Sequence, residues 1–151
     1  DAGFSMAARR WSTCASATTP QGAHAQRAAD AGGIEDPQVA GVQQFGCLAL
    51  GNVCSGSDAA GLARNTQRAA DAGGIELVVA AIQARPQVAI VQDFGCCALF
   101  NVCFGSDAAA RARRQRAVIA GATEAAVGAM QAHPGDAAVQ RQGRGLRDLL
   151  A

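Results

Sequence analysis

The stretch VQQFGCLALGNVCSGSDAAG at residues 42–61 returns, little changed, as VQDFGCCALFNVCFGSDAAA at residues 91–110. A second phrase, QRAADAGGIE, occurs at residues 26–35 and again at residues 67–76. Repeats at a spacing of roughly 40–50 residues are typical of solenoids, in which one supersecondary unit stacks on the next. Because such stacks present an extended surface to partners, the repeat bears on function as well as on fold.

Composition indicates an all-α chain. Of the 151 residues, 50% are hydrophobic but only 4% are aromatic, and there is no Tyr. The core must therefore consist of Ala, Val, Leu, Ile and Cys, and Ala is the strongest helix former among them. The net charge of +1 gives little general attraction to nucleic acid or to an anionic membrane. No apolar run reaches the ~20 residues that a membrane-spanning helix needs.

The unit at residues 57–105 predicts three helices. A first helix is expected over about residues 58–72, after which Gly73 and Gly74 turn the chain. Pro86 should end the second helix, because the residue before a proline avoids the helical region. The apolar residues of the second helix have the spacing of one buried stripe: Ile75, Val78, Val79 and Ile82. The third helix is expected to turn one face inward: Val88, Val91, Gly95, Leu99 and Val102.

The phrases AGGIELVVAAI and VQDFGCCALFNV resemble the armadillo repeat, whose unit is a short helix, a glycine-containing turn, a second helix and a long third helix. The resemblance covers most of the chain from about Gly22 onward. It implies one domain, a right-handed α-solenoid of about three three-helix repeats. These are an incomplete repeat at residues 22–56, a complete repeat at residues 57–105 and a C-terminal capping repeat at residues 106–151. Residues 1–21 would form an N-terminal cap or the remnant of an earlier third helix.

The first repeat is shorter than the second. The two copies of QRAADAGGIE are 41 residues apart and the two VQ(Q/D)FGC copies are 49 apart, so eight residues are missing from the first repeat. The missing piece corresponds to LVVAAIQA, which is most of a second helix. We therefore expect a loop at residues 35–37 with an exposed apolar patch beside it. The N-terminal segment or a second protein must cover that patch.

In armadillo repeats the third helices line a concave groove, where an asparagine near the end of each helix bonds the backbone of an extended peptide. The matching residues are Asn52 and Asn101, and an amide suits this role because it is both donor and acceptor. Leu48 and Cys97 stand where the family often has tryptophan, which removes large aromatic contact surfaces. Helical spacing places three more apolar residues on the same face: Phe45, Ile90 and Phe94. Alternatively, the two amides only cap neighbouring turns or bond each other's helix.

The last repeat ends on a polar third helix. Counting back from Leu146 puts Asp148 at the asparagine position and Arg144 at the tryptophan position, an i, i+4 pair that can form a salt bridge. A polar face suits the end of a stack, so we interpret this helix as a cap. The Asp148 carboxylate could instead receive a basic side chain of a partner.

The one basic cluster lies on the first helix of this repeat: Arg111, Arg113, Arg114 and Arg116. Such a patch could bind phosphates without sequence specificity. Because no nucleic-acid-reading motif accompanies it, we expect a solvated helix face that nearby acids partly neutralise, and no specific nucleic-acid partner.

Six cysteines raise the possibility of metal, redox or disulfide chemistry. Cys47 and Cys54 recur as Cys96 and Cys103, seven residues apart each time, which is roughly one helix face and predicts buried structural cysteines. Zinc sites usually show a CxxC-like pair with a matching second pair, which is missing here. Adjacent Cys96 and Cys97 point about 100° apart on a helix, which disfavours a disulfide. Metal or redox chemistry at this pair stays open as a third hypothesis.

We expect an intracellular, cytoplasmic protein from the free cysteines, although the Arg-, Ser- and Ala-rich start also resembles an organelle transit peptide. His24 and His133 lack the neighbours of a catalytic constellation, so no enzyme activity, cofactor or metal is expected. The predicted function is non-catalytic protein–protein interaction, as a structural or scaffold subunit of a larger assembly. The alternative is a peptide-binding adaptor that uses the asparagine groove.

Overall fold

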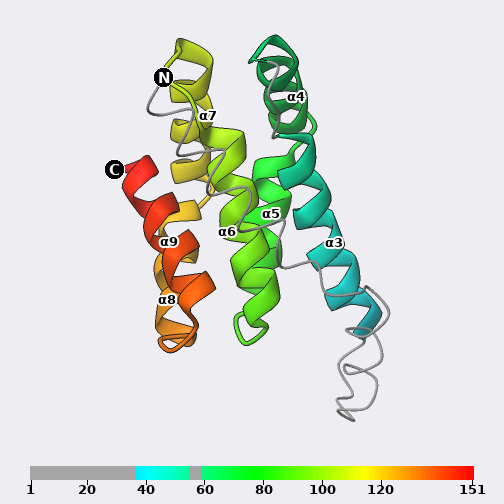
Figure 1. Cartoon of the computed structure of the whole chain (residues 1–151), viewed down its shortest axis with the longest axis vertical. Coiled ribbons are helices and arrows are strands. Elements are labelled where there is room, and N and C mark those ends of the chain that lie inside the picture. The colour runs from blue at the N-terminus through cyan, green and yellow to red at the C-terminus, as the bar shows by residue number, and fades with distance from the viewer. Residues whose placement is uncertain (1–36, 55–58) are drawn as a thin grey trace.

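The computed structural model describes residues 37–54 and 59–151, and this part of the chain is helical without strands (Figure 1). Its helices are α3 (Pro37–Val53), α4 (Ala59–Asp71), α5 (Gly74–Ala84), α6 (Ala89–Cys103), α7 (Ala108–Ile119), α8 (Ala122–Ala132) and α9 (Ala137–Leu150). The expected all-α class is thus confirmed for the described residues. None of these helices has the length and apolar character needed to cross a bilayer.

Some sequence predictions fall outside this range. The cap or remnant helix at residues 1–21, His24, the first-repeat residues up to Asp36, and Ser57 all lie outside the described residues. Pro37 was expected in a loop, but it opens α3. Its fixed φ and missing N–H suit the first turn of a helix, where the amide has no intrahelical partner.

The turns before α5 and α8 are built alike. Gly73 has φ 82° before α5, and Gly121 has φ 90° before α8. Glycine adopts this left-handed conformation without a steric penalty, which is why the turn falls there. The predicted stripe of Ile75, Val78, Val79 and Ile82 is buried, and α5 ends at Ala84, two residues before Pro86, as predicted.

The three long helices lie side by side in chain order, with α6 between α3 and α9 (Figure 1). The second helices form another row, in which α5 packs against α6 and α8, and α8 packs against α9. Fully buried aliphatic residues fill the space between the rows: Ile75, Val91, Leu99, Val102, Val139 and Leu146.

A glutamine joins α5 to α6, and another joins α8 to α9; Gln92 is buried and Gln140 is half-buried. Gln92 Nε2 donates hydrogen bonds to the carbonyl oxygens of Ile82 at 2.9 Å and Arg85 at 2.8 Å. Gln140 Nε2 does the same to Met130 at 2.7 Å and His133 at 3.1 Å. The last carbonyls of a helix have no intrahelical partner, so this amide caps the C-terminus of the second helix.

A glycine nearby on the third helix lets the second helix approach closely. A Cβ atom on Gly95 would lie 2.6 Å from Ile82 Cγ1, and one on Gly143 would lie 2.6 Å from Met130 Cγ. Both distances are shorter than non-bonded carbon atoms tolerate. The glutamine and glycine contacts therefore recur together, each shifted by 48 residues between the two repeats.

This shift fixes the register of α9 against α6. Gly145 and Leu149 occupy the positions of Cys97 and Asn101, so the equivalence obtained by counting back from Leu146 is wrong by one residue. Arg144 and Asp148 instead match Cys96 and Phe100. The physical reason is that α9 is an uninterrupted helix, in which a single-residue deletion would rotate every later side chain by about 100°.

Candidate functional site

The apolar residues proposed for the groove on α6 are largely covered. Phe94 is 5% exposed and Cys97 is 7% exposed. Ile90 is half-buried and packs against the core, as does Leu48 on α3. Phe45 belongs to α3, but its side chain lies outside the part of the chain that the structure describes. These residues act as packing surface more than as an open wall for a peptide.

The Asn101 amide links two helices. Its Nδ2 donates to the carbonyl oxygen of Gly51 on α3 at 3.4 Å and lies 4.0 Å from Cys97 Sγ. A Cβ on Gly51 would lie 3.8 Å from Ala98 Cα and from Asn101 Nδ2, which is ordinary van der Waals contact. Asn52, at the equivalent position of α3, is exposed. For Asn101, the structure therefore shows the interhelical bond that was the alternative to peptide binding.

The described cysteines are free and buried, as predicted. Burial raises the pKa of the Cys47 and Cys54 thiols to about 11 and that of Cys96 and Cys103 to about 12. A thiol that stays protonated at neutral pH is a poor nucleophile and a poor metal ligand. Among the described residues, no group of three or more His, Cys, Asp or Glu side chains is placed to hold a metal ion.

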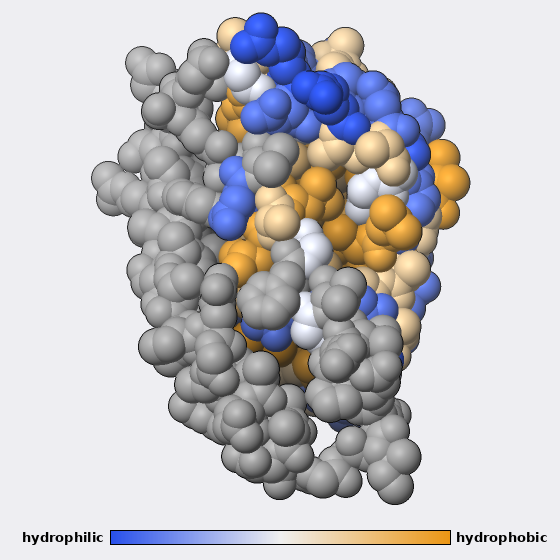
Figure 2. All heavy atoms as spheres, turned by 90° about the vertical axis from the view of Figure 1, so that its right-hand side faces the viewer, coloured by the Kyte–Doolittle hydropathy of each residue, from blue (hydrophilic) through white to orange (hydrophobic). Residues whose placement is uncertain are grey.

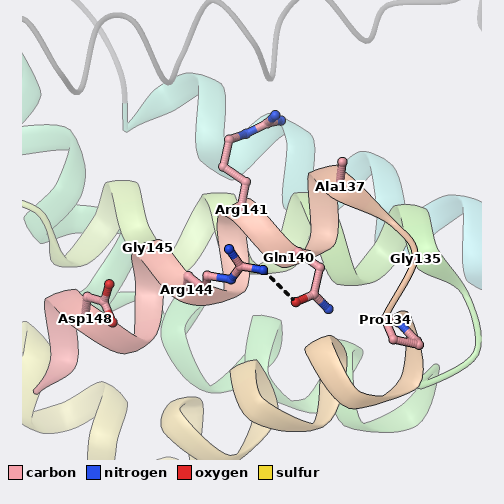
Figure 3. Close-up of a pocket in the computed structure, with 8 residues that line it drawn as sticks. All are labelled: Pro134, Gly135, Ala137, Gln140, Arg141, Arg144, Gly145 and Asp148. Atoms are coloured by element: carbon pink, nitrogen blue, oxygen red, sulfur yellow. Dashed lines mark hydrogen bonds between the residues drawn. The ribbon is translucent and has the colours of Figure 1, made fainter.

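The outer side of α9 borders an open hollow of about 580 Å³. Its lining comes from α9 and the turn before it: Pro134, Gly135, Ala137, Gln140, Arg141, Arg144, Gly145 and Asp148. Figure 3 shows the Arg144 guanidinium directed along α9 to Gln140, whereas Arg141 points away. On α6, the positions that correspond to Arg144 and Asp148 are Cys96, which is buried, and Phe100. The stack therefore changes from apolar to charged at this end.

The expected Arg144–Asp148 salt bridge is absent from the structure. Asp148 Oδ1 accepts from Arg147 Nη2 at 2.8 Å, and Arg144 Nη2 donates to Gln140 Oε1 at 3.3 Å. Gln140 lies one turn before Arg144 and already faces it, so the guanidinium is held away from Asp148. The polar end that suits a cap is retained with different pairs.

The arginine cluster on α7 is solvated only in part, because Arg111 is exposed and Arg116 half-exposed whereas Arg113 is buried. Arg113 is 6% exposed, and its Nε donates to the Val102 carbonyl oxygen at 2.7 Å while Nη1 donates to Gln67 Oε1 at 3.1 Å. Arg114 Nη1 donates to the carbonyl oxygens of Cys103 at 3.2 Å and Gly105 at 2.7 Å. Two of the cluster's arginines therefore cap the C-terminal end of α6, where carbonyls lack helical partners and cations are favoured.

The outer members of this cluster are also paired. Arg116 makes two hydrogen bonds to Glu76 on α5, and this partner lowers the pKa of the Glu76 carboxyl. Arg111 Nη1 donates to the Ser106 carbonyl oxygen at 3.0 Å. Neutralisation by a nearby acid was correctly predicted for Arg116. Phosphate binding loses support, because these four guanidinium groups already have partners within the chain.

His133 has a structural contact that its place in a turn did not reveal. Its Nε2 lies 2.8 Å from the Pro86 carbonyl oxygen, which joins the turn after α8 to the turn after α5. To donate this bond, Nε2 must carry the proton.

Asp93 on α6 is a titratable group that sequence reasoning missed. Burial raises the pKa of its carboxyl to about 6, with Arg141 opposing the shift and Asp136 adding to it. Its Oδ1 is buried without a hydrogen-bond partner in the described part of the chain. The sequence signal for this group is its position, because the equivalent residues of α3 and α9 are Gln44 and Arg141, and only α6 has a carboxylic acid there.

The opposite end of the stack exposes apolar surface. Leu77 on α5 is 68% exposed, although aliphatic side chains of this size usually lie in the core. On the side where α3 and α4 lie, hydrophobic residues gather below a hydrophilic region (Figure 2). The apolar patch predicted beside residues 35–37 stays a prediction, because residues 35 and 36 lie outside the described part of the chain.

No family model matches the chain, and no curated protein or solved structure matches it.

Proposed function

We propose that the chain is a short right-handed α-solenoid of about three armadillo-like repeats, and that it acts as a non-catalytic protein–protein interaction module. Support for the repeat comes from the order of packing, in which α6 joins α3 to α9 and α5 joins α8. Further support comes from the glutamine cap and the glycine contact, which recur at the same spacing in the two later repeats.

The observation that carries the function is the difference between the two ends. The α9 end presents Arg144, Arg147 and Asp148, whose charges favour contact with water. The α5 end presents Leu77 with 68% of its surface in contact with solvent. Val118 and Ile119 on α7 are also exposed, so the contrast lies between the charged face of α9 and the apolar side of α5. A stack with a charged third helix at one end and an exposed apolar second helix at the other is suited to a structural subunit that is joined to a larger assembly through α5.

The peptide-groove alternative receives less support. It needs the amides of Asn52 and Asn101 to engage an extended backbone, but the Asn101 amide donates to the Gly51 carbonyl oxygen. A peptide would have to replace that bond, and the gain from a new hydrogen bond would be offset by the loss of the existing one.

Purification of the tagged chain from its native cells tests the proposal. We expect one or more other polypeptides at a constant molar ratio, retained through size-exclusion chromatography and through a wash in 0.5 M salt. Retention in salt is expected because apolar contacts are not screened as ion pairs are. A folded, monodisperse monomer without a co-purifying polypeptide would contradict the proposal.

A further inference from the structure

The second helix of each later repeat sits on a seat made by two residues of its third helix. In the complete repeat, Gln92 caps the end of α5 and Gly95 receives Ile82. In the last repeat, Gln140 and Gly143 do the same for α8 through Met130. A glutamine and a glycine three residues later on the third helix therefore hold the second helix in both cases.

The same pair is present on α3, where the chain lacks most of a second helix. Gln43 and Gly46 precede Gln92 and Gly95 by 49 residues, the spacing of the repeated stretch. Gly46 is exposed, and no described atom lies within 4 Å of the position of a Cβ there. Gln43 Oε1 is buried but has no hydrogen-bond partner in the described residues. The seat on α3 is thus formed, and no residue of the described ranges 37–54 and 59–151 fills it.

The neighbouring wall of this seat is the exposed side of α5. Leu77 is 68% exposed, whereas its equivalent in the next repeat, Ala125, is 6% exposed within α8, against which α5 packs. Leu50 of α3 reaches within 3.3 Å of a Cβ position on Gly74, so α3 and α5 adjoin along this edge. A helix placed there would continue the interface by which α5 packs on α8.

We propose that the seat formed by Gln43 and Gly46 on α3 and Leu77 on α5 binds an α-helix supplied by another polypeptide, which completes the first repeat in trans. The chemistry of that helix follows from the occupants of the other two seats, α5 and α8. It is about three turns long, with a stripe of Ala and branched aliphatic residues, and its last carbonyls are received by the Gln43 amide after rotation of its terminal group. This inference rests on the proposed interaction function and names the site of contact.

A capped synthetic peptide of residues 73–86, which is α5 with its flanking turns, is the probe, and the full chain is the receptor. We expect saturable binding in fluorescence anisotropy. Leu77→Glu should weaken it at least tenfold, since it replaces a buried apolar contact by a charge. Ile119→Glu is the matched control, because Ile119 is 80% exposed on α7 and is not one of the seat residues, so this change should leave binding intact.

A second pair of variants tests the glycine. Gly46→Ala should leave the free chain folded, because no described atom lies near the added methyl, but it should weaken peptide binding as the equivalent contact at Gly95 implies. Gly41→Ala, also on α3 with no described atom within 4 Å, is its control and should bind as the wild type does. Insertion of LVVAAIQA after Glu35 restores the missing residues and should abolish peptide binding, because the seat is then filled in cis.

Absence of peptide binding to the wild type, or equal binding by the Leu77→Glu and insertion variants, would overturn the inference. Self-association of the wild type that Leu77→Glu abolishes would also overturn it, since a second copy would then be the occupant. If a native partner stays bound to Leu77→Glu at an unchanged ratio, the seat is wrong but the interaction module stands. If the peptide data hold and no native partner is found, the interaction module fails and the seat stands.

Discussion

Replacement of Arg113 by Met should lower the free energy of unfolding by about 2–4 kcal/mol. Met keeps the length of the apolar stem but removes the two donors, so the carbonyl of Val102 and the Oε1 of Gln67 lose their partners. Hydrogen bonds from charged groups contribute about 1.5–3 kcal/mol each, and a buried carbonyl left without a partner costs about 1–3 kcal/mol. Arg113 is 6% exposed, so water cannot replace the lost bonds.

Neighbouring arginines provide the controls for this experiment. Arg114→Met removes bonds to Cys103 and Gly105 at a more exposed site and should cost about 1 kcal/mol. Arg111→Met removes one exposed bond and should cost less than about 0.5 kcal/mol.

Urea unfolding followed by circular dichroism measures the three variants. With a slope of about 2 kcal/mol/M, the midpoint of Arg113→Met should fall by about 1–2 M. The same ranking should persist in 0.5 M salt, because the bonds of Arg113 are buried. If Arg113→Met and Arg111→Met unfold at the same urea concentration, the guanidinium does not cap α6 and the cluster is a solvated face after all.

Three further predictions concern groups inside the stack. Folding raises the pKa of the Asp93 carboxyl from 3.8 to about 6. Between about pH 4 and pH 6 the folded chain therefore keeps a proton on Asp93 that the unfolded chain has released, and the free energy of unfolding should fall as pH rises through that window. Asp93→Asn should remove this pH dependence and stabilise the chain at pH 7 by about 1–2 kcal/mol, a value discounted for the partial exposure of the carboxyl. Thermal melts at pH 4, 5, 6 and 7 measure both effects. Gly95→Ala should cost about 1–3 kcal/mol by overpacking against α5, whereas Gly46→Ala should stabilise α3 by about 0.5–1 kcal/mol. Urea titrations measure both variants, and equal effects would contradict the difference between the two seats. Gln92→Met should cost about 1–3 kcal/mol because two carbonyls lose their cap. Gln43→Met should instead leave the stability unchanged or raise it by about 1 kcal/mol, because it removes a buried oxygen without a partner among the described residues, and calorimetric melting temperatures separate the two outcomes.

The second helix of the complete repeat was predictable because local rules agree there. The stripe from Ile75 to Ile82, the glycine turn at Gly73 and the stop before Pro86 each depend on residues close in sequence. Tertiary packing at the C-terminal end of α6 could not be predicted in this way. Arg113 caps a carbonyl eleven residues earlier in the chain, and its burial depends on how α7 folds back onto α6.

The α6 residues proposed for the groove have a different environment from the expected open face, because Phe94 and Cys97 are buried and Asn101 bonds α3. Helical spacing puts Asn101 and Cys97 on one face, yet it says nothing of how closely α3 approaches that face. The packing of α3 on α6 decides this point, since it brings the Gly51 carbonyl oxygen within 3.4 Å of Asn101 Nδ2. An amide that can bond a peptide can equally bond a neighbouring helix, and distance alone selects between the two.

The seat on α3 is costly to the isolated chain. A glycine in an exposed helix interior costs about 0.5–1 kcal/mol relative to alanine, and Gly46 has no described neighbour that needs the space. A buried polar atom without a partner among the described residues, as at Gln43 Oε1, costs about 1–3 kcal/mol. Leu77 is exposed, so its apolar side chain contributes no burial energy to the isolated chain. A helix placed on the seat would offset these costs, because it would pack beside Gly46, give the Gln43 amide a carbonyl after rotation of its terminal group and cover Leu77. The free chain should therefore be less stable than the completed repeat, by an amount that the insertion of LVVAAIQA makes measurable.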